Sequence, residues 1–159
     1  MPLNIVLIEP EIPMNTGNIG RLSLASGCNL HLVKPFGFDI SDSRLKRAGL
    51  DYWKHVSLTV YDNEDEFFTV NKGKRMVFFS TNGLKNHWSI EFEDNLFLIF
   101  GKESVGLSKT IIEKHRTQLY RIPVMSPHVR SLNLANAVSV VVYEGMRQLN
   151  PSGNKLSEI

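Results

Sequence analysis

Short apolar runs recur along the chain in a pattern typical of buried strands. The first covers residues 3–8, is rich in Leu, Ile and Val, and is followed by Pro10, which cannot donate a hydrogen bond to a neighbouring strand. The same pattern predicts further strands at residues 30–33, 56–61, 75–80, 96–100 and 119–124.

Between these runs, apolar residues recur at helical spacing. One such segment predicts a helix that begins near Asn15, with Asn15 or Thr16 as its cap, and that ends at Gly27. The last predicted helix carries a broad apolar stripe, and Ser131 stands where its cap is expected. Helices are predicted in all at residues 15–26, 41–50, 63–70, 108–116 and 131–149.

Strands and helices alternate, and the strands are apolar enough to be covered on both faces. This order predicts an α/β fold with a mostly parallel sheet flanked by helices. The length of 159 residues fits one domain, which we assign to residues 1–150, with a polar tail at residues 151–159. Because such sheets bind ligands at the carboxyl ends of their strands, function is expected in the loops after residues 8, 80, 100 and 124.

Composition narrows the class of protein further. Hydrophobic residues make up 42% of the chain and charged residues 21%, which excludes a disordered or fibrous protein. No apolar run is long enough to cross a bilayer and no secretory signal is recognisable, so we expect a cytoplasmic protein without a membrane partner. The single cysteine, Cys28, excludes an internal disulfide. The net charge of +2 does not by itself indicate nucleic-acid binding, although Lys and Arg gather in local clusters.

Familiar nucleotide and metal motifs do not match the chain. Residues 15–20 lack the first glycine of the dinucleotide-binding pattern, and Glu103 stands where a phosphate loop needs Ser or Thr. The five histidines show no metal-binding spacing, so no metal is predicted. His31 lies within an apolar strand and is expected to be a core histidine with satisfied hydrogen bonds, whereas His128 lies in a candidate site loop.

Three segments at predicted strand ends combine small, polar and charged residues: 15–21 (NTGNIGR), 100–107 (FGKESVGL), and 122–123 (IP) followed by 130–137 (RSLNLANA). Glu103, on a tight glycine loop, is expected either to hold a second segment through hydrogen bonds or to cap a simple turn. In this order the segments resemble the three motifs of the SPOUT methyltransferases, which are trefoil-knotted enzymes that use S-adenosylmethionine. The resemblance covers residues 3–149 and is closest to the small tRNA (cytidine/uridine-34) 2′-O-methyltransferases.

The resemblance implies a C-terminal trefoil knot, S-adenosylmethionine as co-substrate and no metal. It also implies that Arg21 acts on the target ribose, with Asn15 and Tyr143 as further catalytic candidates; a surface arginine and a core tyrosine are the alternatives. Because a guanidinium stays protonated, Arg21 is expected to orient the hydroxyl and stabilise charge. The cofactor-binding residues implied by the resemblance are Phe79, Gly101, Glu103, Ile122, Ser131 and Asn133.

The resemblance implies two macromolecular partners. These are tRNA, methylated on the ribose of nucleotide 34, and a second copy of the chain, bound through the first and last helices. Three alternatives stay open: the same reaction on another tRNA position or on rRNA, a non-catalytic RNA-binding protein of the same fold, and a nucleotide-binding regulator. The candidate phosphate contacts are Arg44, Lys46, Arg47, Arg116, Arg121 and Arg130.

Overall fold

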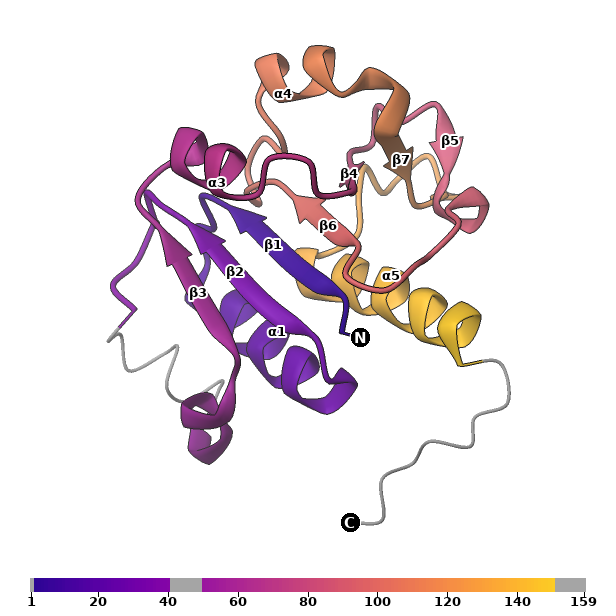
Figure 1. The fold of residues 1–159 in the computed structure, drawn as a ribbon. Coiled ribbons are helices and arrows are strands. Elements are labelled where there is room, and N and C mark those ends of the chain that lie inside the picture. The colour runs from indigo at the N-terminus through magenta and orange to yellow at the C-terminus, as the bar shows by residue number, and fades with distance from the viewer. Residues whose placement is uncertain (1, 41–49, 151–159) are drawn as a thin grey trace.

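The structure is a computed structural model that describes residues 2–40 and 50–150 (Figure 1). The predicted tail at residues 151–159 and nearly all of the predicted helix at residues 41–50 lie outside the described residues, as do Arg44, Lys46 and Arg47. The assignment of residues 1–150 to a single domain stays a prediction, and so does the trefoil knot.

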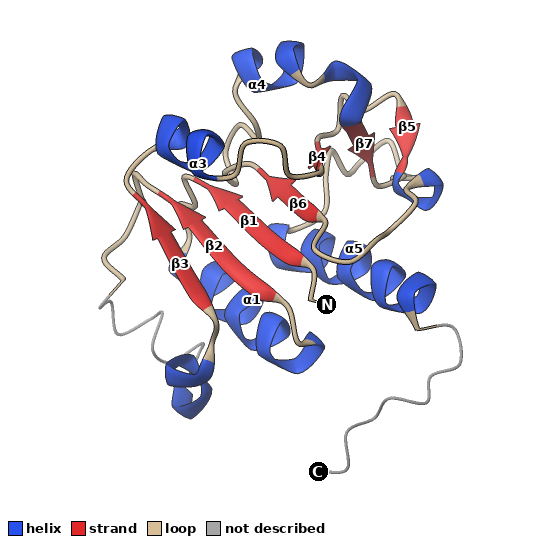
Figure 2. Cartoon of the chain, viewed as in Figure 1, coloured by secondary structure: helices blue, strands red, loops and turns tan. Residues whose placement is uncertain are grey.

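A seven-stranded sheet has the order β3-β2-β1-β6-β4-β7-β5, and every pair of neighbouring strands is parallel (Figure 2). This arrangement confirms the predicted α/β class. The strands are β1 (Asn4–Ile8), β2 (Asn29–Val33), β3 (Leu58–Tyr61), β4 (Met76–Phe79), β5 (Lys85–Asn86), β6 (Phe97–Phe100) and β7 (Leu119–Arg121).

Helices cover both faces of the sheet, α1 and α5 on one face and α3 and α4 on the other (Figure 2). The α-helices are α1 (Pro13–Ser26), α3 (Glu64–Val70), α4 (Lys109–Lys114) and α5 (Leu134–Leu149). Short 3-10 turns occur at η1 (Leu50–His55), η2 (His87–Ser89) and η3 (Arg116–Gln118). No helix among the described residues is long and apolar enough to span a membrane.

Strand β1 shows how the apolar pattern builds two cores. Successive side chains of a strand point to opposite faces. Ile5 and Leu7 therefore pack in the cluster that includes α1 and α5, while Val6 and Ile8 pack in the cluster that includes α3 and α4. All four are at most 3% exposed, so residues 5–8 are all apolar because the strand is buried on both faces.

Two helices begin two or more residues away from the predicted start, whereas α3 and α4 begin within one residue of it. Helix α1 begins at Pro13, two residues before Asn15, because proline suits the first helical position, where no N–H is needed. Asn15 and Thr16 are buried in the first turn and do not cap it. Helix α5 begins at Leu134, and its cap is Asn133, whose side-chain oxygen accepts hydrogen bonds from two backbone N–H groups; Ser131 is not the cap.

The sheet differs from the prediction at β5 and β7. Strand β7 ends at Arg121 and not at residue 124, since Pro123 has no N–H to give to a ladder. Strand β5 was not predicted, because Lys85 and Asn86 carry no apolar pattern. The prediction for His31 is confirmed: its ring is buried and lies 3.0 Å from the Tyr61 hydroxyl and 3.1 Å from Asn4 Oδ1, and burial lowers its pKa to about 4.

Candidate functional site

A cavity of about 570 Å³ lies at the carboxyl ends of β4, β6 and β7. Its walls come from residues 79–82, 100–106 and 130–134, with contributions from Ile12, Asn15, Ile112, Ile122, Val124 and the start of α5. The volume falls within the range of about 300–1,000 Å³ that small-molecule sites occupy. The cavity therefore lies where parallel sheets place their ligands.

The residues predicted to bind the cofactor come together at this cavity. Phe79 and Gly101 are buried at the ends of β4 and β6, and Ser131 is exposed at the rim. Asn15 and Arg130, predicted for other roles, also line the cavity. The full set of predicted cofactor residues at the cavity is Phe79, Gly101, Glu103, Ile122, Ser131 and Asn133.

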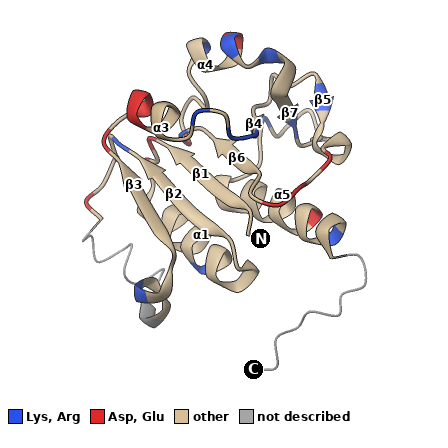
Figure 3. Ribbon diagram, viewed as in Figure 1, with Lys and Arg blue, Asp and Glu red and all other residues tan. Residues whose placement is uncertain are grey.

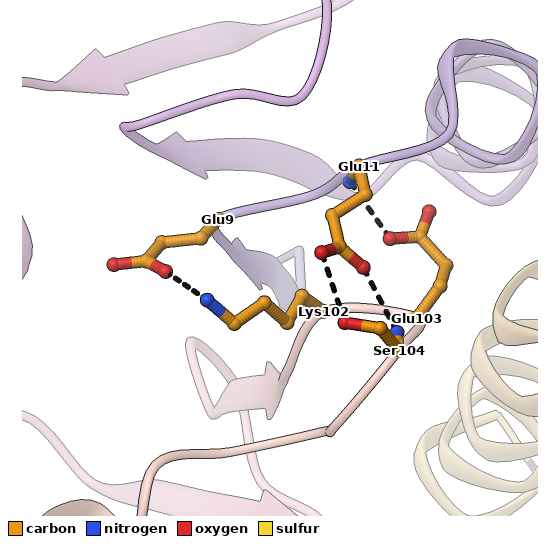
Figure 4. Close-up of polar contacts among 5 residues, drawn as sticks. All are labelled: Glu9, Glu11, Lys102, Glu103 and Ser104. Carbon is orange, nitrogen blue, oxygen red and sulfur yellow. Dashed lines mark hydrogen bonds and ion pairs between the residues drawn. The ribbon is translucent and has the colours of Figure 1, made fainter.

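Two strand-end loops are joined side chain to side chain (Figure 4). Lys102 Nζ donates to Glu9 Oε2 at 2.5 Å, and the backbone N–H and hydroxyl of Ser104 donate to Glu11, each at 2.9 Å. Both pairs are 93 residues apart in the chain, which is also the offset of the register between β1 and β6, where Leu7 is opposite Phe100. The register of the two strands therefore sets which residues of the two loops lie opposite each other.

Glu103 points the other way and binds the start of α1. Its carboxylate accepts hydrogen bonds from the backbone N–H groups of Glu11 at 2.7 Å and Ile12 at 3.1 Å, and from Asn15 Nδ2 at 3.2 Å. Helix α1 has no side-chain cap of its own and no acidic residue in its first turn. Glu103 places a negative charge there from a distant loop, which stabilises the helix terminus.

Asn15 connects this loop to the last helix. While Asn15 Nδ2 donates to Glu103, Asn15 Oδ1 accepts from Asn133 Nδ2 at 3.0 Å. Asn133 in turn caps α5. Both polar atoms of the Asn15 side chain thus form hydrogen bonds within the protein. Through them, Asn15 joins the start of α1 to the Glu103 loop and to the start of α5. Its predicted part in catalysis stays a prediction.

Gly101 permits the close packing of the glycine loop. A Cβ at this position would lie 2.1 Å from the backbone carbon of Gly106 and 2.2 Å from the nitrogen of Leu107. Gly106, at φ +72°, turns the chain back so that its N–H donates to the carbonyl of Lys102 at 2.9 Å. The loop can therefore present its backbone directly to the cavity.

Charge in the joined loops is balanced locally. Hydrogen bonds from Ser104 lower the pKa of Glu11, and the hydrogen bond to Glu9 raises the pKa of Lys102. Burial, followed by the nearby carboxylate of Glu9, raises the pKa of Glu64. Lys102, which lines the cavity, therefore stands as a cation among the carboxylates of Glu9, Glu11 and Glu64.

Two predicted catalytic residues do not line the cavity of the single chain. Arg21 is exposed on α1, with its guanidinium 5.3 Å from the centre of the Tyr52 ring. Tyr143 is exposed on α5, so the alternative of a core position is wrong. The RNA candidates Arg116 and Arg121 are exposed near the β7 edge, and Arg130 is exposed at the rim of the cavity.

Sequence reasoning missed Glu9, Glu11, Lys102 and Ser104. The signal was present in the chain, because acids at alternate positions after one strand match a cation and a hydroxyl at alternate positions after another. Using that signal required the register of β1 against β6, which one sequence does not supply. Among residues 2–40 and 50–150, no group of three or more His, Cys, Asp or Glu side chains is placed to hold a metal ion.

Comparison with known proteins gives a consistent set of relatives. Residues 2–143 match the family model described as "SpoU rRNA Methylase family". A tRNA (cytidine(34)-2′-O)-methyltransferase of Escherichia coli K12 is 45% identical over 157 residues, covering 98% of this chain and 99% of that protein.

Solved structures agree with the sequence relatives. One, described as giving structural insights into the 2-OH methylation of C/U34 on tRNA, is 44% identical with a TM-score of 0.89 and covers 94% of this chain and 97% of that one. The SpoU methyltransferase AviRb from Streptomyces viridochromogenes, in complex with AdoMet, is 23% identical with a TM-score of 0.83, and the match covers 93% of this chain and 58% of that one. This last likeness shows a shared fold.

Proposed function

The chain belongs to the SpoU rRNA methylase family, and from this premise we propose that it methylates the 2′-hydroxyl of the ribose of nucleotide 34 in tRNA. One observation carries the proposal. The cavity at the strand ends is lined by every residue predicted for S-adenosylmethionine, in a chain that matches a named tRNA (cytidine(34)-2′-O)-methyltransferase over 98% of its length.

The cavity suits S-adenosylmethionine as co-substrate. Apolar walls from Phe79, Ile122 and Leu132 fit the flat adenine ring, while the backbone of the glycine loop offers hydrogen-bonding groups to the ribose and the amino acid portion. Transfer forms a C–O bond on the RNA ribose, breaks the C–S bond of the sulfonium and releases the hydroxyl proton. The protein must align the two reactants and exclude water, and AviRb, which shares the fold, was solved with this molecule.

Arg21 acts on the ribose in this proposal, as the resemblance implies. Since Arg21 lies outside the cavity lining of its own chain, the proposal requires a homodimer in which Arg21 of the partner subunit completes the site. Exposed apolar side chains on α1 and α5 support this assembly: Met14, Leu24, Val140 and Tyr143 are all at least 40% exposed. Tyr143 would then lie at the same interface.

The RNA contacts follow from exposed cations. Arg116, Arg121 and Arg130 are exposed, and Arg130 stands at the mouth of the cavity, where it can bind the phosphate next to the target ribose. A tRNA substrate is consistent with action in the cytoplasm. A second candidate, methylation of rRNA, is favoured by the description of the family itself.

Methyl transfer to defined RNAs tests the proposal. Purified protein is incubated with labelled S-adenosylmethionine and tRNA that lacks methylation at nucleotide 34, and nuclease fragments are analysed by mass spectrometry. A methyl group on the ribose of nucleotide 34 is the expected result. Methylation of rRNA in its place would favour the second candidate, and absence of S-adenosylmethionine binding would overturn both.

Arg21→Ala tests the catalytic assignment. The variant is expected to bind S-adenosylmethionine normally and to lose at least about 100-fold in turnover, the order of effect of removing a charge-stabilising group. Lys72→Ala, which removes an exposed cation on the turn between α3 and β4, is the matched control and is expected to retain activity. Full turnover in Arg21→Ala would show that this residue is not catalytic.

A further inference from the structure

The edge of the sheet formed by β5 and β7 carries cations, and acidic residues flank it in the loop after η2 and on α4 (Figure 3). Residues 84–90 and 114–124 contain no Asp or Glu. Strand β5 pairs with β7, with Asn86 opposite Arg121, so the two segments form one surface. Its cations are Lys85, Arg116 and Arg121, whereas Lys114 has its Nζ 5.8 Å from the centre of the Phe68 ring on α3.

Two of these cations are held in place by contacts along the edge. Lys85 Nζ donates to the carbonyl of Thr117 at 3.1 Å and lies 5.6 Å from the centre of the Tyr120 ring. Arg121 Nε donates to Asn86 Oδ1 at 3.2 Å, which leaves the two terminal nitrogens of its guanidinium for an outside ligand. The edge is thus a fixed positive surface that suits phosphate groups.

Trp88 follows Lys85 by three residues, in the turn after β5, and is 63% exposed. The turn that carries it is anchored on both sides, since His87 and Ile90 are each 2% exposed. Ile90 N–H donates to the carbonyl of His87 at 3.1 Å, and the Ser89 hydroxyl donates to the carbonyl of Asn86 at 2.8 Å. A rigid turn therefore exposes a large aromatic ring to solvent. Such exposure is unfavourable, and a ligand that covers the ring would remove this unfavourable contribution.

The edge continues from the cavity. Asn82 and Ile122 line the cavity, and the chain runs from them directly to Leu84 and Arg121 on the edge. Gly83 lies between, so close to the backbone of Tyr120 that a Cβ would approach its carbonyl carbon to 2.4 Å. An RNA strand whose target ribose lies at the cavity would therefore contact the β5–β7 edge with its neighbouring nucleotides.

We propose that the β5–β7 edge binds unpaired nucleotides that flank the target, with Trp88 stacking on a base and Lys85 and Arg121 contacting phosphates. Aromatic side chains beside cations are how proteins bind single-stranded RNA without reading its sequence. This inference rests on the proposed function, because it assumes an RNA substrate at the cavity. It adds a base-stacking site to the phosphate contacts already predicted.

Binding of a synthetic anticodon stem-loop RNA, measured by fluorescence anisotropy over a range of salt concentrations, tests the inference. Trp88→Ala is expected to weaken binding by about 5- to 100-fold, the effect of one stacked base, without changing the slope of affinity against salt. Trp88→Phe, which keeps an aromatic face, is expected to retain most of the affinity. Val70→Ala, at a residue 65% exposed on α3, is the matched control and should bind as the unmodified protein does.

The two cations give a separate signature. Lys85→Ala and Arg121→Ala are each expected to reduce the salt slope by about one unit, whereas Lys72→Ala should leave it unchanged. S-adenosylmethionine binding, measured by calorimetry, is expected to be the same in all of these variants.

Several outcomes would overturn the inference. Unchanged RNA affinity in Trp88→Ala would remove the stacking site and leave the proposed function intact, and altered self-association of that variant in sedimentation would assign the edge to a protein contact. Failure of the unmodified protein to bind RNA would overturn both proposals together.

Discussion

The two walls of the cavity are built differently. On one side, residues 9–15 and 101–107 are joined by the carboxylates of Glu9, Glu11 and Glu103, which between them accept six hydrogen bonds. On the other side, residues 123–132 make two hydrogen bonds within the described chain, both inside the loop, from Val129 and His128 to Ser126. Every residue from 125 to 133 is exposed.

The difference between the two walls fits two tasks of the cavity, which are to hold a small co-substrate and to admit a large RNA. A small co-substrate needs a fixed surface, because its reactive group must be aligned with the acceptor. A large RNA needs an accessible surface that adjusts to it as it enters. We infer that the joined loops fix one side of the co-substrate, and that the loop after β7, which also carries Ser131 and Leu132, is the side that adjusts when the RNA enters.

The largest expected effect comes from Gly101→Ala, which breaks the joined wall. The new Cβ has no room beside the backbone of Gly106 and Leu107, so the loop must move, at a cost of about 1–3 kcal/mol in the free energy of unfolding. S-adenosylmethionine affinity, measured by calorimetry, is expected to fall at least about tenfold. Gly73→Ala is the control: its φ of +83° causes a strain of about 1–2 kcal/mol but no contact lies within 4 Å, and S-adenosylmethionine affinity should not change.

Glu103→Ala is expected to have the next largest effect. It removes the acceptor for Glu11 N–H, Ile12 N–H and Asn15, and hydrogen bonds to a charged group contribute about 1.5–3 kcal/mol. The loss is measured by urea denaturation. Glu103→Gln keeps one acceptor oxygen and is expected to recover part of the stability. Equal stability in all three proteins would contradict the role given to this carboxylate.

Low pH is expected to weaken the contact between Glu11 and Ser104 and so to lower the free energy of unfolding. Because hydrogen bonds from Ser104 lower the pKa of Glu11, the charged form stabilises the folded protein above the ordinary value of 4.5, and this stability is lost as the pH falls through the lowered pKa. Glu11→Gln should therefore be less stable than the unmodified protein at pH 7, and the gap should close in acid. Glu144, whose pKa is lowered to about 2 by hydrogen bonds from Arg147 and Gln148, is present in both proteins and cancels in the difference.

The smallest effect is expected in the exposed wall. Met125 is 93% exposed, so Met125→Ser should change the free energy of unfolding by no more than about 0.5 kcal/mol and should leave S-adenosylmethionine affinity unchanged. Denaturation and calorimetry check both values. A loss as large as that of Glu103→Ala would show that the two walls are equally constrained.

The sequence predicted most of the fold because its elements depend on local patterns. Residues 5–8 of β1 and all of β6 are continuous apolar runs, and Asn63 and Ser108 stand in the chain where their side chains cap α3 and α4. The start of α1 was missed because the carboxylate that completes it comes from Glu103, far along the chain. A two-residue strand such as β5 leaves no periodicity to detect.

For the site, the sequence located the segments but not their geometry. The resemblance found in residues 15–21, 100–107 and 130–137 is confirmed by the family match, and the predicted cofactor residues gather because each follows a parallel strand. The joined loops were not foreseen, since they depend on which strands are neighbours and in what register. Nor does the single chain bring Arg21 to the cavity, so its part in catalysis rests on the proposed homodimer.

The register shared by β1 and β6 has a consequence for insertions and deletions. Glu9 meets Lys102 and Glu11 meets Ser104 because both pairs keep the offset of 93 residues that the register of β1 against β6 sets. Removing or adding one residue between Ile8 and Glu11 would change this offset and separate Glu11 from Ser104. A substitution in this segment loses one contact, whereas a change in its length would break the alignment of every contact that follows.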